Sequence, residues 1–369
     1  MEKTISIIGI GRLGLCMALS FSLKGFNVVG VDLDSNYINS LNTKTFSSFE
    51  PHVNEYLSQV TTFEASTNLQ KALDHSRLIF ISVPTPNGGG EDFYDHSILT
   101  NLLTRINRLK PKDKHFVICC TVMPGFCDKI GKLLVEDCEN CTLSYNPEFI
   151  AQGAIIFGLE NPDMILIGEG SVQAGDQIQQ VYKKVCLSSP TICRMKPLEA
   201  EIVKLSVNGF ITTKIAYANM IGDACLGCGA DPGVVMSAVG QDSRIGTKYF
   251  KPGYSYGGPC FPRDTQALSL FVTSQGLLPS ILKATHESNE KHVEYQVNQL
   301  LKTQNTQFTF TGICYKEGSK VPIIDESPKL KIAKRLVESG KKVTICDTKA
   351  LIDEVKKKYG NLFMYVIEQ

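Results

Sequence analysis

The sequence lacks an excess of charge of either sign, a long apolar run and a dense framework of cysteines. Its 38 lysines and arginines almost balance 37 aspartates and glutamates, so the net charge gives no reason to expect a nucleic-acid or membrane partner. No stretch approaches the ~20 apolar residues that cross a bilayer, and the apolar start at 5–8 runs into a glycine loop rather than a cleavage site. The 13 cysteines are scattered through 369 residues, unlike those of a small secreted domain. We therefore expect a cytoplasmic protein with free thiols.

Histidines are few, which weakens the case for a metal site. Two cysteine pairs, at 138 and 141 and at 225 and 228, have the spacing of zinc ligands, but the 6 histidines do not cluster near them. Cys225 also falls inside an expected helix. We expect no metal, because ordinary thiols explain the pairs better than a structural zinc ion.

A glycine-rich turn follows the first expected strand. Residues 4–10 are apolar and rich in β-formers, and Gly9-x-Gly11-x-x-Gly14 leads into a helix-like run at 15–24. Gly9 allows the tight turn, Gly11 allows the backbone to approach a pyrophosphate, and Gly14 allows close packing of helix on strand. The pattern predicts a dinucleotide-binding loop, with a glycine turn that binds nothing as the alternative.

An acidic residue completes the fingerprint. The second expected strand, at 27–31, ends on Asp32, about twenty residues after the glycines. A carboxylate there accepts hydrogen bonds from the adenosine ribose and repels a 2′-phosphate. The expected cofactor is therefore NAD rather than NADP.

Two further strands, expected at 78–83 and 115–120, end in loops that contain Thr85 and Thr121. Ligands of an open parallel sheet bind beyond the carboxyl ends of its strands, so these loops should border the nicotinamide. The alternative for each threonine is ordinary turn or cap chemistry.

A long helix is expected from 197 to about 225, because apolar residues recur along it without an internal proline. Lys204 and Asn208 are four residues apart and share one face of this helix. The pair could clamp an alkoxide or a sugar hydroxyl, although such a pair alone is more often a solvated surface.

The segment 251–264 places one cysteine among glycines and prolines. Such a loop brings backbone donors close to phosphates, and its rigid prolines can hold the thiol of Cys260 in place. Arg263, followed by Asp264, could favour the thiolate. The alternative is an inert structural thiol, as for most buried cysteines.

Together these residues resemble the UDP-glucose/GDP-mannose dehydrogenase family from residue 5 to about 347. The shared motifs are Gly9-x-Gly11-x-x-Gly14, Val-Pro-Thr-Pro at 83–86, Thr-Val-Met-Pro-Gly at 121–125, Asn-Pro-Glu-Phe at 146–149, Glu201-x-x-Lys204-x-x-x-Asn208 and Gly-Gly-Pro-Cys-Phe-Pro-Arg-Asp at 257–264. Each motif is short, but their order and spacing identify the chain as a member of this family.

The resemblance implies that the C6 alcohol of a nucleotide sugar is oxidised to the carboxylate by two successive hydride transfers to NAD. In this scheme the Cys260 thiolate captures the aldehyde as a thiohemiacetal, which is oxidised to a thioester that water hydrolyses. Lys204 and Asn208 are implied to stabilise the developing oxyanion.

The other site residues are carried over in the same way. Asp264 and Thr121 are implied to position the proton-carrying water, and Glu148 to act in the hydrolysis. The expected cofactor contacts are Gly9, Ile10, Gly11, Leu13, Gly14, Asp32, Val83, Pro84, Thr85, Thr121, Glu148 and Arg263. The expected substrate contacts are Glu148, Phe149, Ile150, Gln152, Lys204, Asn208, Arg244, Tyr249, Tyr256, Gly257, Cys260 and Lys316.

The expected fold is α/β with more than one domain, since single cores stop growing near ~250 residues. The resemblance implies an NAD-binding Rossmann-type domain at 1–195 and a central helical region with the cysteine loop at 196–301. A short Rossmann-like α/β domain at 302–369 is implied to cover the nucleotide sugar. The helix from 197 is implied to form the core of a homodimer.

The chain departs from the family pattern at several positions. Ala-Gln-Gly at 151–153 stands where the family usually has Arg-Glu-Gly, and Arg263 replaces a lysine with different hydrogen-bond geometry. No arginine lies between Lys316 and the Glu-Ser-Pro at 326–328, although relatives use one there to contact substrate. The third domain is also expected to be short.

Several functions remain open. The Asn-Pro-Glu-Phe motif at 146–149 resembles the branches that oxidise UDP-glucose and GDP-mannose more than the N-acetylhexosamine branch. We expect UDP-glucose, oxidised to UDP-glucuronate, with GDP-mannose or a UDP-N-acetylhexosamine as alternatives. A hydroxyacid or 6-phosphogluconate-like dehydrogenase, and an inactive nucleotide-binding relative, are the other two hypotheses.

Overall fold

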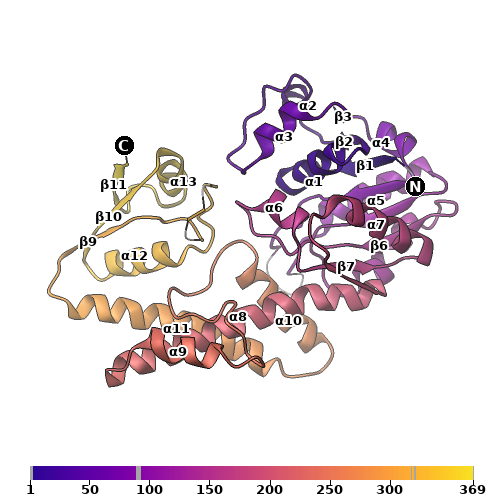
Figure 1. The fold of residues 1–369 in the computed structure, drawn as a ribbon. Helices are drawn as coiled ribbons and strands as arrows, with labels where there is room; N and C mark the ends of the chain where they lie inside the picture. Colours follow the sequence, from indigo (N-terminus) through magenta and orange to yellow (C-terminus); the bar gives the residue numbers. More distant parts are fainter. Residues whose placement is uncertain (1–2, 89–92, 317, 320, 369) are drawn as a thin grey trace. The chain divides into compact units, whose positions relative to one another are not determined.

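The computed structural model describes residues 3–88, 93–316, 318–319 and 321–368 (Figure 1). It divides into two compact units, Met1–Lys204 and Leu205–Gln369. The predicted α/β class is confirmed by a large, mostly parallel sheet in the first unit. Among the described residues, no helix combines the length and apolarity needed to span a membrane.

The first unit alternates strands and helices. Its strands are β1 (Thr4–Ile8), β2 (Asn27–Val31), β3 (Phe63–Ser66), β4 (Leu78–Ile81), β5 (His115–Ile118), β6 (Thr142–Tyr145), β7 (Met164–Gly168) and β8 (Thr191–Met195). Its helices are α1 (Arg12–Leu23), α2 (Ser35–Asn42), α3 (Val53–Gln59), α4 (Leu69–His75), α5 (Ser97–Leu109), α6 (Ile155–Glu160) and α7 (Val172–Val185). A π-helical turn (Phe126–Gly131) and a 3-10 turn (Leu133–Val135) follow β5.

The eight strands form one sheet in the order β3-β2-β1-β4-β5-β6-β7-β8. Neighbours are parallel except β6 and β7, which are antiparallel. The chain winds outward in opposite directions from β1 and β4, so the loops after these two strands meet at a topological switch point, where open α/β sheets bind ligands.

The central strands β4 and β5 are buried on both faces, which explains why they are largely apolar rather than alternating. In β4, Phe80 packs into one core, while Ile79 and Ile81 pack into the other. All three side chains are fully buried. The sheet is therefore a rigid platform for the loops at its carboxyl edge.

The predicted bounds of β4 and β5 were too long at the carboxyl end. β4 ends at Ile81 because its neighbour β1 ends at Ile8, and Ile8 pairs with Ile81. There Gly9 turns the chain with a φ of +86°. β5 ends level with them, where Ile118 pairs with Ile81. The predicted start of the first helix at 15 was also wrong, because the helix already begins at Arg12.

The second unit is built on long helices. Its elements are α8 (Pro197–Cys228, which begins in the first unit), α9 (Pro232–Gly240), α10 (Phe261–Ser274), α11 (Ser280–Lys302), β9 (Gln307–Phe310), α12 (Pro328–Glu338), β10 (Lys342–Asp347), α13 (Lys349–Tyr359) and β11 (Met364–Ile367). The long helix predicted from 197 is confirmed, and it ends slightly later than expected, before Gly229 with a φ of +80°.

A small sheet closes the second unit. Its order is β11-β10-β9, and all pairs are parallel. Buried residues of α11, α12, β10 and α13 pack together as its core, including Val293, Leu336, Ile345 and Ile352. The predicted division at 1–195, 196–301 and 302–369 stays a prediction, and its second and third parts lie mainly in this unit.

Candidate functional site

The glycine turn has the geometry that the sequence predicted. A Cβ on Gly9 would lie 2.4 Å from the Ser82 oxygen, and one on Gly14 would lie 2.0 Å from the Gly9 oxygen. A Cβ on Gly11 would meet no atom within 4 Å. Gly9 and Gly14 are therefore required by packing of the protein itself, whereas open space at Gly11 leaves room for a bound group.

The N-terminus of α1 is available to an anion. Gly11 is its N-cap, no side chain in the described chain caps it, and its first turn carries no acid. Unpaired amides at a helix N-terminus attract phosphate. The Tyr37 hydroxyl donates to the buried Ile10 carbonyl at 2.7 Å and holds the turn in place. These residues fit a pyrophosphate.

Asp32 lies at the end of β2, where an adenosine ribose would bind. Its amide donates to the Ser66 carbonyl at 3.1 Å, and one carboxylate oxygen accepts from the Leu33 amide at 2.7 Å. The other oxygen can accept from a ribose hydroxyl. The Leu33 side chain is 80% exposed beside it and offers an apolar surface to a base.

The loops after β4 and β5 are joined through two predicted site residues. Thr85, which follows Val83 and Pro84, is buried and donates to the Thr121 carbonyl at 2.8 Å. The buried Glu201 accepts from the amides of Gly125 and Cys127 at 2.5 and 2.9 Å, which anchors the loop that follows Thr121.

Glu148 lies in the first unit against α7. The Tyr182 hydroxyl is 2.5 Å from its Oε1, and burial raises the pKa of this carboxyl to about 7. The Lys204 Nζ donates to the Glu148 carbonyl at 2.9 Å and lies 4.8 Å from the centre of the Phe149 ring. The structure thus brings together Glu148, Phe149 and Lys204 from the predicted set.

Gln152 connects the expected substrate loop to the cofactor loop. Its Oε1 accepts from the Arg12 guanidinium at 2.6 Å. The buried Glu50 accepts from the amides of Gly153 and Ile155 at 2.8 Å each and fixes this loop, which also contains Ile150. Gln152, one of the departures from the family pattern, therefore has a defined partner.

In the second unit, Asn208 donates to the Asp264 carboxylate at 2.6 Å. Both side chains are buried. Cys260 is the N-cap of α10, four residues before Asp264 along the chain, and the N-terminus of a helix favours a thiolate. Arg263 Nε lies 3.8 Å from Asp264 Oδ1. These four predicted residues lie on or beside the first turn of α10 and the adjoining part of α8.

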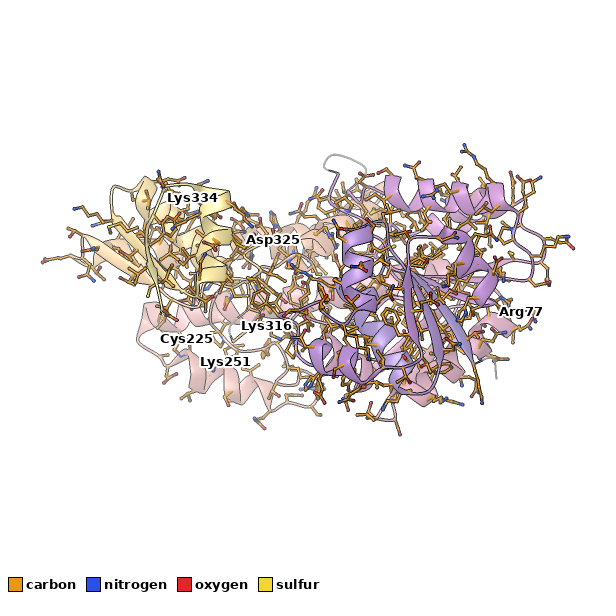
Figure 2. The ribbon with its side chains drawn as sticks, turned by 90° about the horizontal axis from the view of Figure 1, so that it is seen from above. Arg77, Cys225, Lys251, Lys316, Asp325 and Lys334 are labelled. Atoms are coloured by element: carbon orange, nitrogen blue, oxygen red, sulfur yellow. The ribbon has the colours of Figure 1, made fainter. Side chains whose placement is uncertain are left out.

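The glycines before Cys260 allow close packing against the C-terminal part of the unit. A Cβ on Gly257 would lie 2.0 Å from the Glu326 oxygen, and one on Gly258 would lie 2.3 Å from the Tyr315 ring. The Gly258 amide donates to the Asp325 carbonyl at 3.1 Å. The loop that carries Lys316, which Figure 2 labels with Asp325, therefore packs on the cysteine loop.

Of the remaining predicted substrate residues, one lies beside the cysteine, one is buried in the interior and one is on the surface. Tyr249 lies edge-on to Phe261, beside Cys260, with ring centres 6.1 Å apart. Tyr256 is 4% exposed and forms part of the packed interior. Arg244 has an 87% exposed side chain that pairs with its neighbour Asp242 at 2.7 Å, so it belongs to the outer surface of the described chain.

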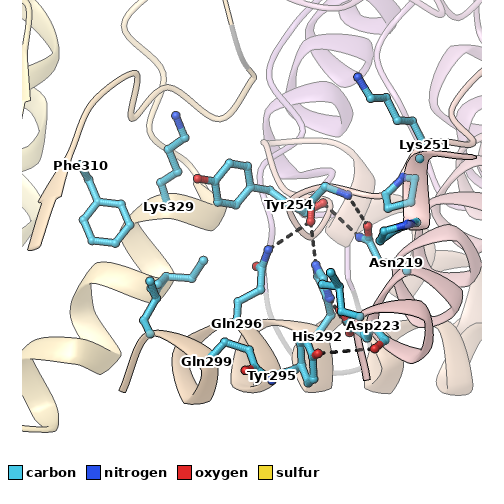
Figure 3. A pocket seen from close by; sticks show the side chains of 18 of the residues that line it. Asn219, Asp223, Lys251, Tyr254, His292, Tyr295, Gln296, Gln299, Phe310 and Lys329 are labelled. Carbon is cyan, nitrogen blue, oxygen red and sulfur yellow. Dashed lines mark hydrogen bonds and ion pairs between the residues drawn. The ribbon is translucent and has the colours of Figure 1, made fainter. Parts of the chain in front are cut away.

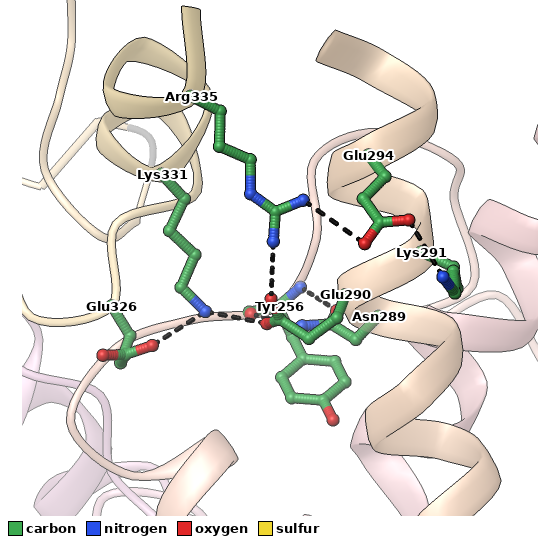
Figure 4. Close-up of polar contacts among 8 residues, drawn as sticks. All are labelled: Tyr256, Asn289, Glu290, Lys291, Glu294, Glu326, Lys331 and Arg335. Carbon is green, nitrogen blue, oxygen red and sulfur yellow. Dashed lines mark hydrogen bonds and ion pairs between the residues drawn. The ribbon is translucent and has the colours of Figure 1, made fainter. Parts of the chain in front are cut away.

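Sequence reasoning missed the residues that hold the cysteine loop. The Asn289 side chain accepts from the Tyr256 amide at 2.8 Å and donates to the Tyr256 carbonyl at 3.2 Å. The next residue, Glu290, forms ion pairs with Lys331 and Arg335 of α12 (Figure 4). No sequence signal marks these contacts, since they join segments more than thirty residues apart.

A second group of polar side chains holds the preceding segment. His292 and Gln296 of α11 donate to the Gly253 carbonyl at 2.8 and 3.1 Å, and Asn219 of α8 accepts from the Gly253 amide at 2.9 Å (Figure 3). They line a cavity of about 690 Å³ within the second unit. Because their polar groups bond to the protein itself, they serve to position the loop.

The fold and these residues define an NAD-binding oxidoreductase with a Rossmann-type domain and a second, helical unit that carries a cysteine loop. The NAD-binding-domain model of the UDP-glucose/GDP-mannose dehydrogenase family matches residues 3–186, and its central-domain model matches residues 198–291. The chain therefore belongs to this family of NAD-dependent nucleotide-sugar 6-dehydrogenases, as the motifs predicted.

Individual relatives include enzymes for different sugars. A UDP-glucose 6-dehydrogenase from Rickettsia bellii is 28% identical over 98% of this chain and 85% of its own length. A GDP-mannose 6-dehydrogenase from Pseudomonas savastanoi pv. phaseolicola is 29% identical over 93% and 80%. The solved structure of a UDP-glucose dehydrogenase from Pyrobaculum islandicum matches with a TM-score of 0.90 and 29% identity, covering 99% of this chain and 86% of that one.

Proposed function

We propose that this chain oxidises the C6 alcohol of UDP-glucose to the carboxylate of UDP-glucuronate. The observation that carries the chemistry is Cys260 at the N-terminus of α10, beside the buried Asn208–Asp264 pair. A thiol at a helix N-terminus is suited to covalent capture of an aldehyde. The choice of UDP-glucose is supported by the similarity to the UDP-glucose dehydrogenase of Pyrobaculum islandicum.

NAD, when bound at the Gly11 turn and Asp32, would accept a hydride in each of two oxidations. The substrate alcohol first loses a hydride from C6 and a proton from its oxygen, which leaves an aldehyde. The Cys260 sulfur then forms a bond to the aldehyde carbon, giving a thiohemiacetal. Loss of the second hydride from that carbon and of the proton from its oxygen gives a thioester. Attack by water then breaks the carbon–sulfur bond and releases the carboxylate and the Cys260 thiolate.

The other residues supply charge and protons in this scheme. The Lys204 ammonium and the Asn208 amide would stabilise negative charge on the C6 oxygen. Thr121 and Asp264 would position water, and Glu148, with its pKa of about 7, would take the proton of the water that attacks the thioester. Balanced overall, one alcohol, two NAD molecules and one water give one carboxylate, two NADH and three protons.

A substrate panel tests the proposal. The purified protein is incubated with NAD and with UDP-glucose, GDP-mannose or UDP-N-acetylhexosamines, and NADH and sugar acid are both measured. We expect UDP-glucose to be turned over with two NADH for each acid formed. Turnover of GDP-mannose or an N-acetylhexosamine in its place would contradict the choice of sugar.

The NADH count separates the remaining alternatives. One NADH for each substrate, with no acid, would contradict the four-electron mechanism and favour a hydroxyacid-type dehydrogenase. Binding of NAD and nucleotide sugar without any turnover would indicate an inactive relative.

A further inference from the structure

The Tyr182 hydroxyl in the first unit lies between two acceptors. Tyr182 is fully buried on α7, and its oxygen is 2.5 Å from Glu148 Oε1 and 2.7 Å from Asn146 Oδ1. The orientation of the Asn146 amide is set by its other end, because Nδ2 donates to the Leu166 carbonyl of β7 at 2.8 Å. The oxygen of Asn146 therefore faces Tyr182 as an acceptor.

A tyrosine hydroxyl has one proton and can donate to only one of these acceptors at a time. When Glu148 is ionised, the hydroxyl donates to the carboxylate, and Asn146 Oδ1 receives no hydrogen bond from it. When Glu148 is protonated, the carboxyl donates to the tyrosine oxygen, and the tyrosine donates to Asn146. Rotation of one proton thus provides a hydrogen-bond partner for Glu148 in both states.

We propose that Tyr182, with Asn146 as its second acceptor, is a positioning residue that holds Glu148 in both protonation states and sets the balance between them. This role rests on the proposed function only in that Glu148 exchanges a proton with water during turnover. Tyr182 would act through Glu148 without touching the substrate.

The charged and titratable neighbours of Glu148 support this assignment. Lys204 of α8 supplies the positive charge, since its effect, like that of Tyr182, lowers the pKa of Glu148 against the larger effect of burial. The thiols of Cys119, after β5, and Cys186, after α7, also lie near enough to interact electrostatically with Glu148. Burial raises the pKa of both thiols, to about 11 for Cys186, so both are neutral near pH 7.

Replacing Tyr182 and replacing Asn146 should shift the pKa of Glu148 in opposite directions. Tyr182→Phe removes the donor that favours the carboxylate, so the pKa of Glu148 should rise by about one unit, the size expected for one buried hydrogen bond. Asn146→Ala removes the competing acceptor, so Tyr182 always donates to Glu148 and the pKa should fall. A role limited to packing would not produce shifts of opposite sign.

The test is an infrared pH titration of the whole protein without substrate, with Glu148→Gln used to identify the Glu148 carboxyl band. We expect the midpoint to rise in Tyr182→Phe and fall in Asn146→Ala. Tyr145→Phe is the matched control, because Tyr145 is fully buried on β6 and its hydroxyl has no hydrogen-bond partner in the described chain. Its midpoint should match the wild type.

An unchanged midpoint in folded Tyr182→Phe, or an equal shift in Tyr145→Phe, would overturn the proposal. If Tyr182→Phe does not fold, a midpoint in Asn146→Ala that fails to decrease would overturn it alone. The outcome is separable from the proposed function, since the titration needs no turnover. Where nucleotide sugar is oxidised, the low-pH limb of kcat should move with the infrared midpoint in each variant.

Discussion

At the scale of single residues, Cys260 carries the strongest prediction. Cys260→Ala should leave NAD affinity unchanged, because NAD is expected to bind at the Gly11 turn and Asp32. Acid formation should fall at least ~1,000-fold, since the covalent intermediate cannot form. Isothermal titration with NAD and chromatography of the sugar product measure the two effects.

Cys228→Ala is the control for this substitution, because Cys228 is an exposed thiol at the end of α8. It should keep full activity. Wild-type acid formation by Cys260→Ala would show that the covalent mechanism is wrong.

Glu148 sets the expected pH dependence. Burial raises the pKa of its carboxyl to about 7, and only the ionised form can accept a proton from water. Acid formation should therefore rise with pH up to about 7, then level off, and fall about tenfold for each pH unit below that value. A profile of kcat between pH 5.5 and 8.5, with roughly half-unit steps, resolves the limb.

Glu148→Gln removes the base and should lower steady-state turnover at least ~100-fold. Because the oxidations precede hydrolysis, a burst of NADH followed by a stall is expected, with the acyl group on Cys260 detectable by mass spectrometry. Wild-type turnover in this variant would contradict the role of Glu148.

A site residue could be predicted from the sequence when the contacts that require it are made by residues close to it along the chain. Gly9 and Gly14 were predictable, because a tight turn and a close helix–strand contact require glycine within a few residues of sequence. Tyr182 and Asn289 were not, because they reach Glu148 and Tyr256 from segments more than thirty residues away along the chain. Ordinary tyrosines and asparagines in helices give no signal of such contacts.

At the scale of elements, two glycines of the cofactor turn should have different roles. Gly14 is required for packing within the protein, and Gly11 is expected to be required for NAD binding. Gly14→Ala should destabilise the first unit by about 1–3 kcal/mol, because its Cβ would lie 2.0 Å from the Gly9 oxygen. Gly11→Ala should leave stability near the wild type, because its Cβ meets no protein atom within 4 Å and its φ is −64°.

Gly11→Ala should instead weaken NAD binding by about tenfold or more, since the methyl group would occupy the space expected for the pyrophosphate. Thermal unfolding and NAD titration of both variants check this division. Unaltered NAD affinity in folded Gly11→Ala would place the cofactor elsewhere.

The class and order of the elements were predictable, and their ends were less so. Apolar, β-rich runs identified β1 and β2, and recurring apolar residues without an internal proline identified α8. The end of β4 at Ile81 depends on where its spatial neighbour β1 ends. Sequence patterns describe one strand at a time and do not contain that information.

At the scale of the whole molecule, α8 presents apolar side chains that the described chain does not cover. Phe210, Tyr217 and Met220 are 67%, 48% and 48% exposed, and their spacing of seven and three residues puts them along one stripe of the helix. Exposed apolar stripes of this kind are typical of helix–helix interfaces. The stripe supports the predicted homodimer through the central helix.

Replacing Phe210 and Met220 by glutamate should therefore convert a dimer into a monomer, because two buried charges per subunit would face an apolar surface without partners. Light scattering at micromolar concentration measures the mass, and circular dichroism checks the fold. Leu187→Glu is the matched control, since Leu187 is 64% exposed in the connection between α7 and β8, outside α8, and should leave the dimer intact. A wild-type chain of monomer mass, or an unchanged dimer in the double variant, would show that α8 does not join two copies.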